Sequence, residues 1–146
     1  MSRNTASTKA EVSAVEQIYQ AWDDALGRKD LEAAMALYAP DCTLESPLVR
    51  HILGRERGIV DGRADLRAFV TEALSRTPPL RQRHRTGFFT DGRKLMWEYP
   101  RLTEEGEQMD LVEVMEIADG LIQRHRVYWG WRALKVLEDN AYRAGA

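Results

Sequence analysis

The sequence predicts an α+β domain in which three N-terminal helices pack on a curved antiparallel sheet and enclose a cone-shaped pocket. Two observations carry this prediction: helical spacing dominates the first half of the chain, and strand patterns with turn signals dominate the second half. Such segregation favours α+β over alternating βαβ units. Because 146 residues make one domain, we predict a single domain over 1–146 with a flexible N-terminus over 1–7.

The composition restricts the classes of partner and compartment. The chain is 44% hydrophobic and 30% charged, with a formal net charge of −2, which is typical of a folded globular domain. It has no basic stripe, so no nucleic-acid partner is expected. No apolar run approaches the roughly 18 residues of a membrane span, and the N-terminus does not resemble a signal peptide. With a single cysteine, Cys42, we expect a cytoplasmic protein without a membrane partner.

Two helices are predicted first. Thr8 and Glu11 form a capping box before apolar residues at helical spacing, and Gly27 suits the end of this helix. Asp30 can cap a second helix, which Pro40 ends. We therefore expect a pair of packed helices at the start of the fold.

A short strand and a third helix follow. The strand is predicted over Cys42 to Ser46, and the Gly- and Arg-rich stretch from Pro47 to Gly62 is predicted as a loop or a broken segment. The third helix begins at about Asp61 and ends at Thr77-Pro78-Pro79. Residues 132–146 are expected to form a C-terminal helix or tail.

The strongest hairpin signals are the Asp-Gly pairs at 91–92 and 119–120. A two-residue turn at 91–92 gives an inward face that pairs Phe88 with Leu95, Thr86 with Trp97 and His84 with Tyr99. The same register pairs Arg85 with Glu98 on the opposite face, as an ion pair. We therefore expect an aromatic, apolar pocket wall.

Glu113 interrupts the apolar run 111–115, which is expected to supply the next strand. An ionisable side chain there either faces outward, on an edge or a dimer face, or marks a site. The last strand offers two faces, His125 with Val127 and Trp129, or Arg124 with Arg126 and Tyr128, and we favour the first as inward. His125 is then either a structural histidine or a catalytic one.

These patterns define a candidate site. Asp23, at the margin of the apolar stripe of the first helix, is either a surface carboxylate or a group that orients a pocket histidine. The candidate catalytic residues are Glu113, His84, His125 and Asp23. The candidate ligand-binding residues are Tyr19, Trp22, Tyr38, Ser46, Phe88, Trp97, Tyr99, Met115 and Trp129.

The order of elements and several short motifs resemble the nuclear transport factor 2-like superfamily, specifically its SnoaL-like and ketosteroid isomerase-like branches. The resemblance covers roughly Val12 to Trp131. Its carriers are Tyr38-Ala39-Pro40-Asp41-Cys42-Thr43-Leu44-Glu45-Ser46-Pro47, Gly62-Arg63, Asp110-Leu111-Val112-Glu113-Val114-Met115 and Val127-Tyr128-Trp129. The resemblance implies a homodimer formed through the outer face of the sheet, with Arg85, Glu98 and Met96 at or near the interface.

The functional positions of the isomerases are only partly retained. Their general base, an Asp before the proline of the first strand, corresponds to Ser46, with Glu45 beside it. Their oxyanion-hole Asp corresponds to Glu113, a carboxyl that can stay protonated in an apolar site. Their oxyanion Tyr falls near Trp22, with Tyr19 one turn earlier. The resemblance therefore supports the scaffold more than steroid isomerisation itself.

We expect a cofactor-independent enzyme that catalyses proton transfer of the isomerase, cyclase or dehydratase type. Its ligand would be a hydrophobic, carbonyl-bearing small molecule, with His84 or His125 as base and Glu113 as acid or oxyanion partner. No metal or other cofactor is implied. The alternative is a non-catalytic module of the same fold that binds small ligands or proteins.

Overall fold

The computed structural model describes residues 2–76 and 83–144, with side chains from residue 14 onward. The helices in these ranges are α1 (Ser2–Gly27), α2 (Leu31–Met35), α3 (Pro47–Leu53), α4 (Arg63–Ser75) and α5 (Trp131–Glu138). The strands are β1 (Tyr38–Glu45), β2 (Ile59–Asp61), β3 (Phe89–Thr90), β4 (Lys94–Tyr99), β5 (Leu102–Thr103), β6 (Gly106–Glu107), β7 (Leu111–Ala118) and β8 (Leu121–Trp129). The predicted α+β class is confirmed.

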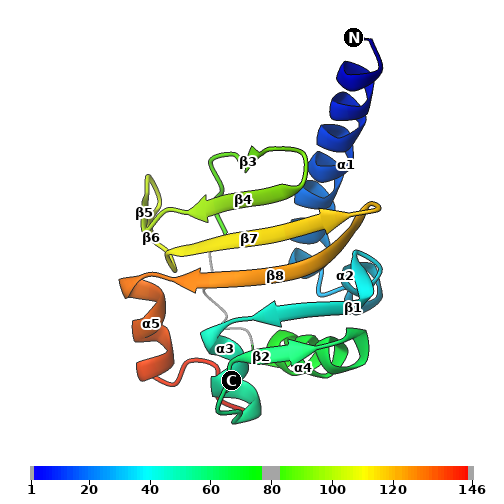
Figure 1. Cartoon of the computed structure of the whole chain (residues 1–146). Helices are drawn as coiled ribbons and strands as arrows, with labels where there is room; N and C mark the ends of the chain where they lie inside the picture. The colour runs from blue at the N-terminus through cyan, green and yellow to red at the C-terminus, as the bar shows by residue number, and fades with distance from the viewer. Residues whose placement is uncertain (1, 77–82, 145–146) are drawn as a thin grey trace.

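The main sheet is curved and unclosed, with the strand order β2-β1-β8-β7-β4-β3. In Figure 1, α1 crosses behind this sheet, α4 lies at the end formed by β1 and β2, and α5 follows the end of β8. The prediction of a wholly antiparallel sheet is wrong for one pair, because β1 and β8 run parallel. The prediction of three N-terminal helices is also incomplete, since α3 joins them, whereas α5 lies almost wholly in the segment 132–146 that was predicted as a helix or tail.

The first helix presents its apolar stripe to the sheet. Val15, Ile18, Trp22 and Ala25 recur at helical spacing, and all are buried. The helix begins at Ser2, earlier than the predicted start at Thr8. The capping box of Thr8 and Glu11 lies outside the described side chains.

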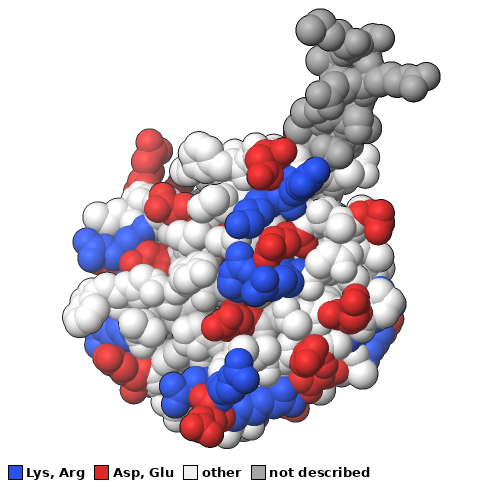
Figure 2. Space-filling model, in the orientation of Figure 1, with Lys and Arg blue, Asp and Glu red and all other residues white. Residues whose placement is uncertain are grey.

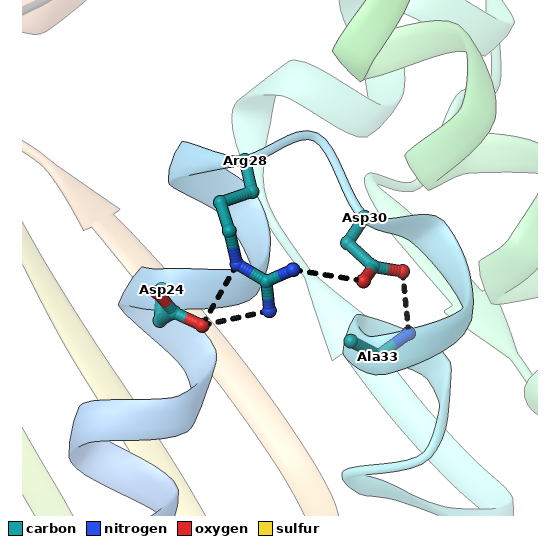
Figure 3. A network of polar contacts seen from close by, with 4 residues as sticks. All are labelled: Asp24, Arg28, Asp30 and Ala33. Carbon is teal, nitrogen blue, oxygen red and sulfur yellow. Dashed lines mark hydrogen bonds and ion pairs between the residues drawn. The ribbon is translucent and has the colours of Figure 1, made fainter.

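The connection from α1 to α2 is held by charged side chains (Figure 3). Arg28 donates from Nε and Nη2 to Asp24 Oδ2 at 3.0 and 2.7 Å, and from Nη1 to Asp30 Oδ2 at 3.1 Å. Asp30 caps α2 as predicted, because its Oδ1 accepts a hydrogen bond from Ala33 N at 3.0 Å. One arginine thus ties the last turn of α1 to the first turn of α2.

The second helix is shorter than predicted, and β1 begins earlier. The helix ends at Met35, and β1 already includes Tyr38 and Pro40. Pro40 is exposed and lies where the register between β1 and β8 shifts, between Tyr38 and Thr43. A proline cannot donate to a strand ladder, so it is tolerated at such an irregularity.

The stretch from Pro47 to Gly62, predicted as a loop or a broken segment, contains α3 and β2, so the first alternative is wrong. Ser46 caps α3 by accepting from Leu48 N at 3.2 Å, and Pro47 occupies the first turn. Gly54 ends the helix with φ of 66°, a left-handed conformation that suits glycine. The following helix agrees with prediction, since α4 ends at Ser75, although Thr77-Pro78-Pro79 lies outside the described residues.

The two Asp-Gly pairs behave differently. Asp119 and Gly120 have φ of 54° and 71° and join β7 to β8 with Ala118 opposite Leu121, which is the predicted two-residue hairpin. Near 91–92, Thr90 pairs instead with Leu95. Asp91 Oδ1 accepts hydrogen bonds from Arg93 N and Lys94 N at 2.9 and 2.8 Å, which widens the turn.

The outer face of the sheet mixes charges of both signs (Figure 2). Glu116 of β7 accepts from Arg126 of β8 at 2.7 Å and lies 3.5 Å from Arg124.

Within the described ranges, the structure contains no helix with the length and apolar character required to cross a bilayer.

Candidate active site

An apolar cavity of about 90 Å³ lies between the inner face of the sheet and the helices. Most of its wall is aliphatic or aromatic, and Glu113, His125, Tyr38 and Arg83 bring polar groups to it. The remaining lining residues are Trp22, Leu26, Ala34, Leu44, Ser46, Leu48, Phe69, Val70, Ala73, Leu74, Leu111, Val127, Trp129 and Tyr142. A few polar groups in an apolar cavity are the usual composition of a small-molecule site.

Four of these side chains form a continuous buried chain of hydrogen bonds. His125 Nε2 lies 2.5 Å from Glu113 Oε2, and His125 Nδ1 lies 2.8 Å from the Tyr38 hydroxyl. Trp22 Nε1 donates to the same hydroxyl at 3.0 Å. Glu113 and His125 are only 2% and 1% exposed, so the polar chain is almost removed from water.

The direction of this chain can be assigned from its donors and acceptors. An indole N–H can only donate, so the Tyr38 oxygen accepts from Trp22. We assign the phenol proton to His125 Nδ1, because among the described residues no other acceptor is hydrogen-bonded to that hydroxyl. His125 then carries its proton on Nε2 and donates it to the Glu113 carboxylate. Burial raises the pKa of Tyr38 far above its usual value, which keeps the phenol protonated as a donor.

Strand register brings the chain together. Glu113 lies opposite Val127, and Met115 lies opposite His125, so the carboxylate and the imidazole sit on one face of adjacent strands. β1 runs beside β8, and Tyr38 reaches His125 from there. Trp22 comes from the buried stripe of α1. The inner face of β8 carries His125, Val127 and Trp129, which is the face that the sequence favoured.

Glu113 keeps one oxygen available. Its Oε2 accepts from His125, and among the described residues Oε1 has no hydrogen-bond partner. Both ring nitrogens of His125, in contrast, are hydrogen-bonded to Glu113 and Tyr38. Of the pair, the carboxylate is therefore the group that can reach a ligand proton.

His84 lies outside the cavity, contrary to the inward position expected from the hairpin register. Its side chain is 46% exposed, and its Nε2 lies 3.7 Å from Glu105 Oε2. The observed register is shifted by two residues, and β3 contains only Phe89 and Thr90. Thr86, expected to face inward with His84, is likewise exposed.

Asp23 and Arg85 pair with each other, not with the partners that the sequence suggested. Arg85 Nη2 lies 3.5 Å from Asp23 Oδ2, and its guanidinium stacks 3.8 Å above the Tyr19 ring. The predicted ion pair between Arg85 and Glu98 is therefore wrong. Asp23 does not contact His125, whose nitrogens bond to Glu113 and Tyr38.

The candidate ligand-binding residues divide into two groups. Trp22, Tyr38, Ser46 and Trp129 line the cavity. The other candidates form a mainly aromatic layer packed behind Trp22. In this layer, the centroid of the Trp97 ring lies 5.3 Å from the ring centroids of both Trp22 and Tyr19. The members of this buried or half-buried set are Tyr19, Phe88, Trp97, Tyr99 and Met115.

Tyr142 is the cavity residue that sequence reasoning missed. It follows α5, is 1% exposed and lines the same cavity. Asp110 positions α5, because its Oδ1 accepts from Ala133 N at 2.8 Å and its carbonyl accepts from Gly130 N at 2.7 Å. One sequence signal could have identified it: Tyr142 is an aromatic residue in the segment 132–146, which was already expected to form a helix or tail.

A family model for the SnoaL-like domain matches residues 15–125, which is most of the chain. The protein belongs to the SnoaL-like domain family. Solved structures agree in fold with this SnoaL-like domain. A SnoaL-like protein of unknown function from Burkholderia thailandensis is 22% identical with a TM-score of 0.68, and the match covers 82% of this chain and 96% of that chain. A nuclear transport factor 2-like protein from Cytophaga hutchinsonii is 15% identical with a TM-score of 0.61, covering 83% and 94%.

One further structural neighbour of the SnoaL-like domain carries a functional description. It is a candidate ketosteroid isomerase from Kribbella flavida, 25% identical with a TM-score of 0.60, and the match covers 82% of this chain and 79% of that chain. No curated protein sequence matches the chain.

Proposed function

We propose that this SnoaL-like domain is a cofactor-independent enzyme that moves a proton on a small, hydrophobic, carbonyl-bearing molecule, as an isomerase, cyclase or dehydratase does. The observation that carries the proposal is the buried chain Trp22, Tyr38, His125 and Glu113 at an apolar cavity. A carboxylate that a neighbouring donor holds in one orientation at the wall of an apolar cavity is placed to act as a general base.

The geometry favours different roles from those that the sequence suggested. Glu113 Oε1 removes the proton next to the carbonyl, because His125 has no nitrogen available for this step. His125 donates to Oε2 and orients the carboxylate, and Tyr38 holds the histidine in the required tautomer. His125 and Tyr38 are thus positioning residues. The proton on Glu113 is returned to another carbon or to a leaving oxygen, which completes the isomerisation or elimination.

The cavity restricts the size of the substrate. A cavity of roughly 150 Å³ lined by apolar residues is known to bind benzene, whereas this one measures about 90 Å³. A cyclic or branched ketone of about the size of benzene would require a modest enlargement of the cavity, whereas a steroid would require a far larger opening of the helices. We therefore favour small ketones over steroids, although a ketosteroid isomerase description belongs to one structural neighbour.

Deuterium exchange at the carbon next to a carbonyl tests the proposal. The wild type should exchange the α-protons of a small cyclic ketone in D₂O faster than buffer, as followed by NMR, and Glu113→Gln should lose at least about 100-fold, the usual contribution of a general base. Glu104→Gln makes the same chemical change at an exposed position outside the cavity and is the matched control.

Two results would separate the alternatives. Saturable ketone binding without exchange in the wild type would remove the catalytic proposal and support a ligand-binding module. Equal exchange by the wild type and Glu113→Gln would show that the base lies elsewhere.

A further inference from the structure

Two hydrogen-bond donors of the cavity wall have no partner in the described part of the chain. The Tyr142 hydroxyl and Trp129 Nε1 are both buried atoms without a hydrogen bond. Both residues line the cavity that contains Glu113 and His125. Neither residue has an interaction of another kind that would occupy the donor. A buried donor without a partner costs free energy, so such groups in a native structure call for an explanation.

The strands place one of these donors, the Trp129 indole, close to the proposed base, and Tyr142 lines the same cavity from beyond α5. Val127 and Trp129 are successive inward residues of β8, and Val127 lies opposite Glu113 while Trp129 lies opposite Leu111. Inward positions two residues apart along a strand are separated by about 7 Å. A ligand of a few heavy atoms can therefore contact Glu113 at one end and the Trp129 indole at the other.

We propose that Tyr142 Oη and Trp129 Nε1 bind the carbonyl oxygen of the ligand, and that they stabilise the negative charge which forms there when Glu113 removes the neighbouring proton. This inference rests on the proposed function for its second half only, since carbonyl binding requires no turnover. An acceptor oxygen satisfies both orphaned donors at once. Donors aimed at a developing oxyanion in a dry site are a strong source of rate acceleration.

The inference gives the C-terminal segment a role in the site. Tyr142 follows α5, and Asp110 anchors α5 next to the end of β8. The rest of the cavity wall comes from α1–α4, β1, β7, β8 and Arg83, so the tyrosine adds a donor from the C-terminal segment to the polar groups of the cone. We therefore expect ligands to be selected for an acceptor oxygen.

The test compares cyclohexanone with methylenecyclohexane, which has the same shape but no acceptor oxygen. Wild-type protein should bind the ketone at least about tenfold more tightly in ligand-observed NMR titrations, and Tyr142→Phe should remove most of that preference while leaving the hydrocarbon unaffected. Trp129→Phe should reduce the preference in the same direction. Tyr128→Phe, which removes an exposed hydroxyl outside the cavity, should leave it unchanged.

The melting temperature of the ligand-free variants distinguishes a ligand-binding role of the Tyr142 hydroxyl from a structural role. Tyr142→Phe should melt at or above the wild-type temperature, because the change removes an unpaired buried hydroxyl. Lower melting with an unchanged ketone preference would overturn the inference, and so would a wild type that does not distinguish the two compounds. If the wild type exchanges deuterium and Tyr142→Phe changes neither ketone binding nor the exchange rate, this inference is wrong while the proposed proton transfer stands. Acceptor-dependent binding without exchange would support it and contradict only the proposed proton transfer.

Discussion

At the scale of single residues, the site depends on one hydroxyl that serves two neighbours. Tyr38 accepts from Trp22 Nε1 and donates to His125 Nδ1, and all three side chains are buried. No other described group is bonded to the Trp22 indole or to that histidine nitrogen. Among the described residues, the hydroxyl is therefore the single hydrogen-bonded link between α1 and the pair formed by Glu113 and His125, beside the edge-to-face contact of the Trp22 and His125 rings.

We expect Tyr38→Phe to destabilise the protein by about 1–3 kcal/mol, because the change leaves a buried N–H and a buried ring nitrogen without partners. Urea unfolding measures the difference, and Tyr128→Phe on the exposed face should change stability by less than about 0.5 kcal/mol. If Tyr38→Phe is as stable as the wild type, water replaces the hydroxyl and the chain is not a closed network.

At the scale of elements, ion pairs hold the helices to the strands around the cavity. Arg55 follows α3 and donates to Asp65 in the first turn of α4, at 2.6 Å from Nη1 and 2.5 Å from Nη2. Asp65 Oδ2 also accepts from Asp61 N of β2 at 2.9 Å. The Arg55 guanidinium is the main cause that lowers the pKa of Asp65, with the Asp61 amide adding to it.

Asp65→Asn should lower stability by about 1 kcal/mol at pH 7, a modest figure because the pair is partly exposed. The pKa of Asp65 is lowered on folding, so its contribution is present above the unfolded value of 3.8 and is lost as the pH falls through the folded value. The difference between wild type and variant in thermal melts should therefore shrink below pH 3.8. The exposed Glu104→Gln serves as control, and a difference that persists at low pH would exclude this ion pair as the cause.

The contact between β8 and α5 leaves no room for a side chain at Gly130. A Cβ there would lie 2.1 Å from Asp110 Oδ2, the carboxylate that anchors α5. Gly130→Ala should displace Asp110 and cost about 1–2 kcal/mol, the cost of losing a helix cap. Gly27→Ala is the matched control, because nothing lies within 4 Å of its Cβ. Equal melting of the two variants would mean that α5 is not anchored at this point.

Short sequence patterns predicted the turns and helix ends that depend only on neighbouring residues in the chain. Asp119-Gly120 forms the expected hairpin because both residues adopt positive φ, whereas Asp91 uses its side chain to bind the backbone and shifts the register. His84 lies outside the site because β3 contains only Phe89 and Thr90, so the sheet does not extend back to this residue. Ser46-Pro47 carried a helix-start signal that identifies α3, but the Gly and Arg content around it favoured a loop.

At the scale of the whole molecule, the outer face of the sheet is the surface where we expect two copies to pair. Phe89, Met96 and Tyr128 are 76%, 41% and 57% exposed there, and the half-buried Val114 lies beside Met96. Exposed apolar groups on adjacent strands indicate an interaction surface. Glu98 also lies on this face, but Arg85 does not, because its side chain is only 10% exposed and covers Tyr19.

Sedimentation velocity tests this assembly. The wild type should sediment as a dimer, and Met96→Glu should shift it to a monomer, since two buried carboxylates would face each other across the twofold axis. Leu134→Glu on α5 is a control of similar exposure, 39% against 41%. A monomeric wild type would contradict the expected homodimer.

The arrangement of the site was predictable only in part, because it depends on pairings between distant strands. Alternation along β8 favoured His125 on the inner face, whereas the face of Glu113 was left open; the carboxylate and the imidazole do meet. No local signal shows that β1 lies parallel to β8, so the bond from Tyr38 to His125 was not foreseen. The same reason explains why Tyr142, beyond the sheet, was missed.

The parallel pairing of β1 with β8 also sets the order in which the protein can assemble. Tyr38 and Ile122 are partners although more than half of the chain lies between them. Contacts of such high sequence separation slow folding, because the closing of a long loop precedes any gain from the contact. The cavity is bounded by both strands, so a partly folded chain with formed helices has no binding site. In refolding experiments, recovery of ligand binding should therefore coincide with the slowest phase rather than with helix formation.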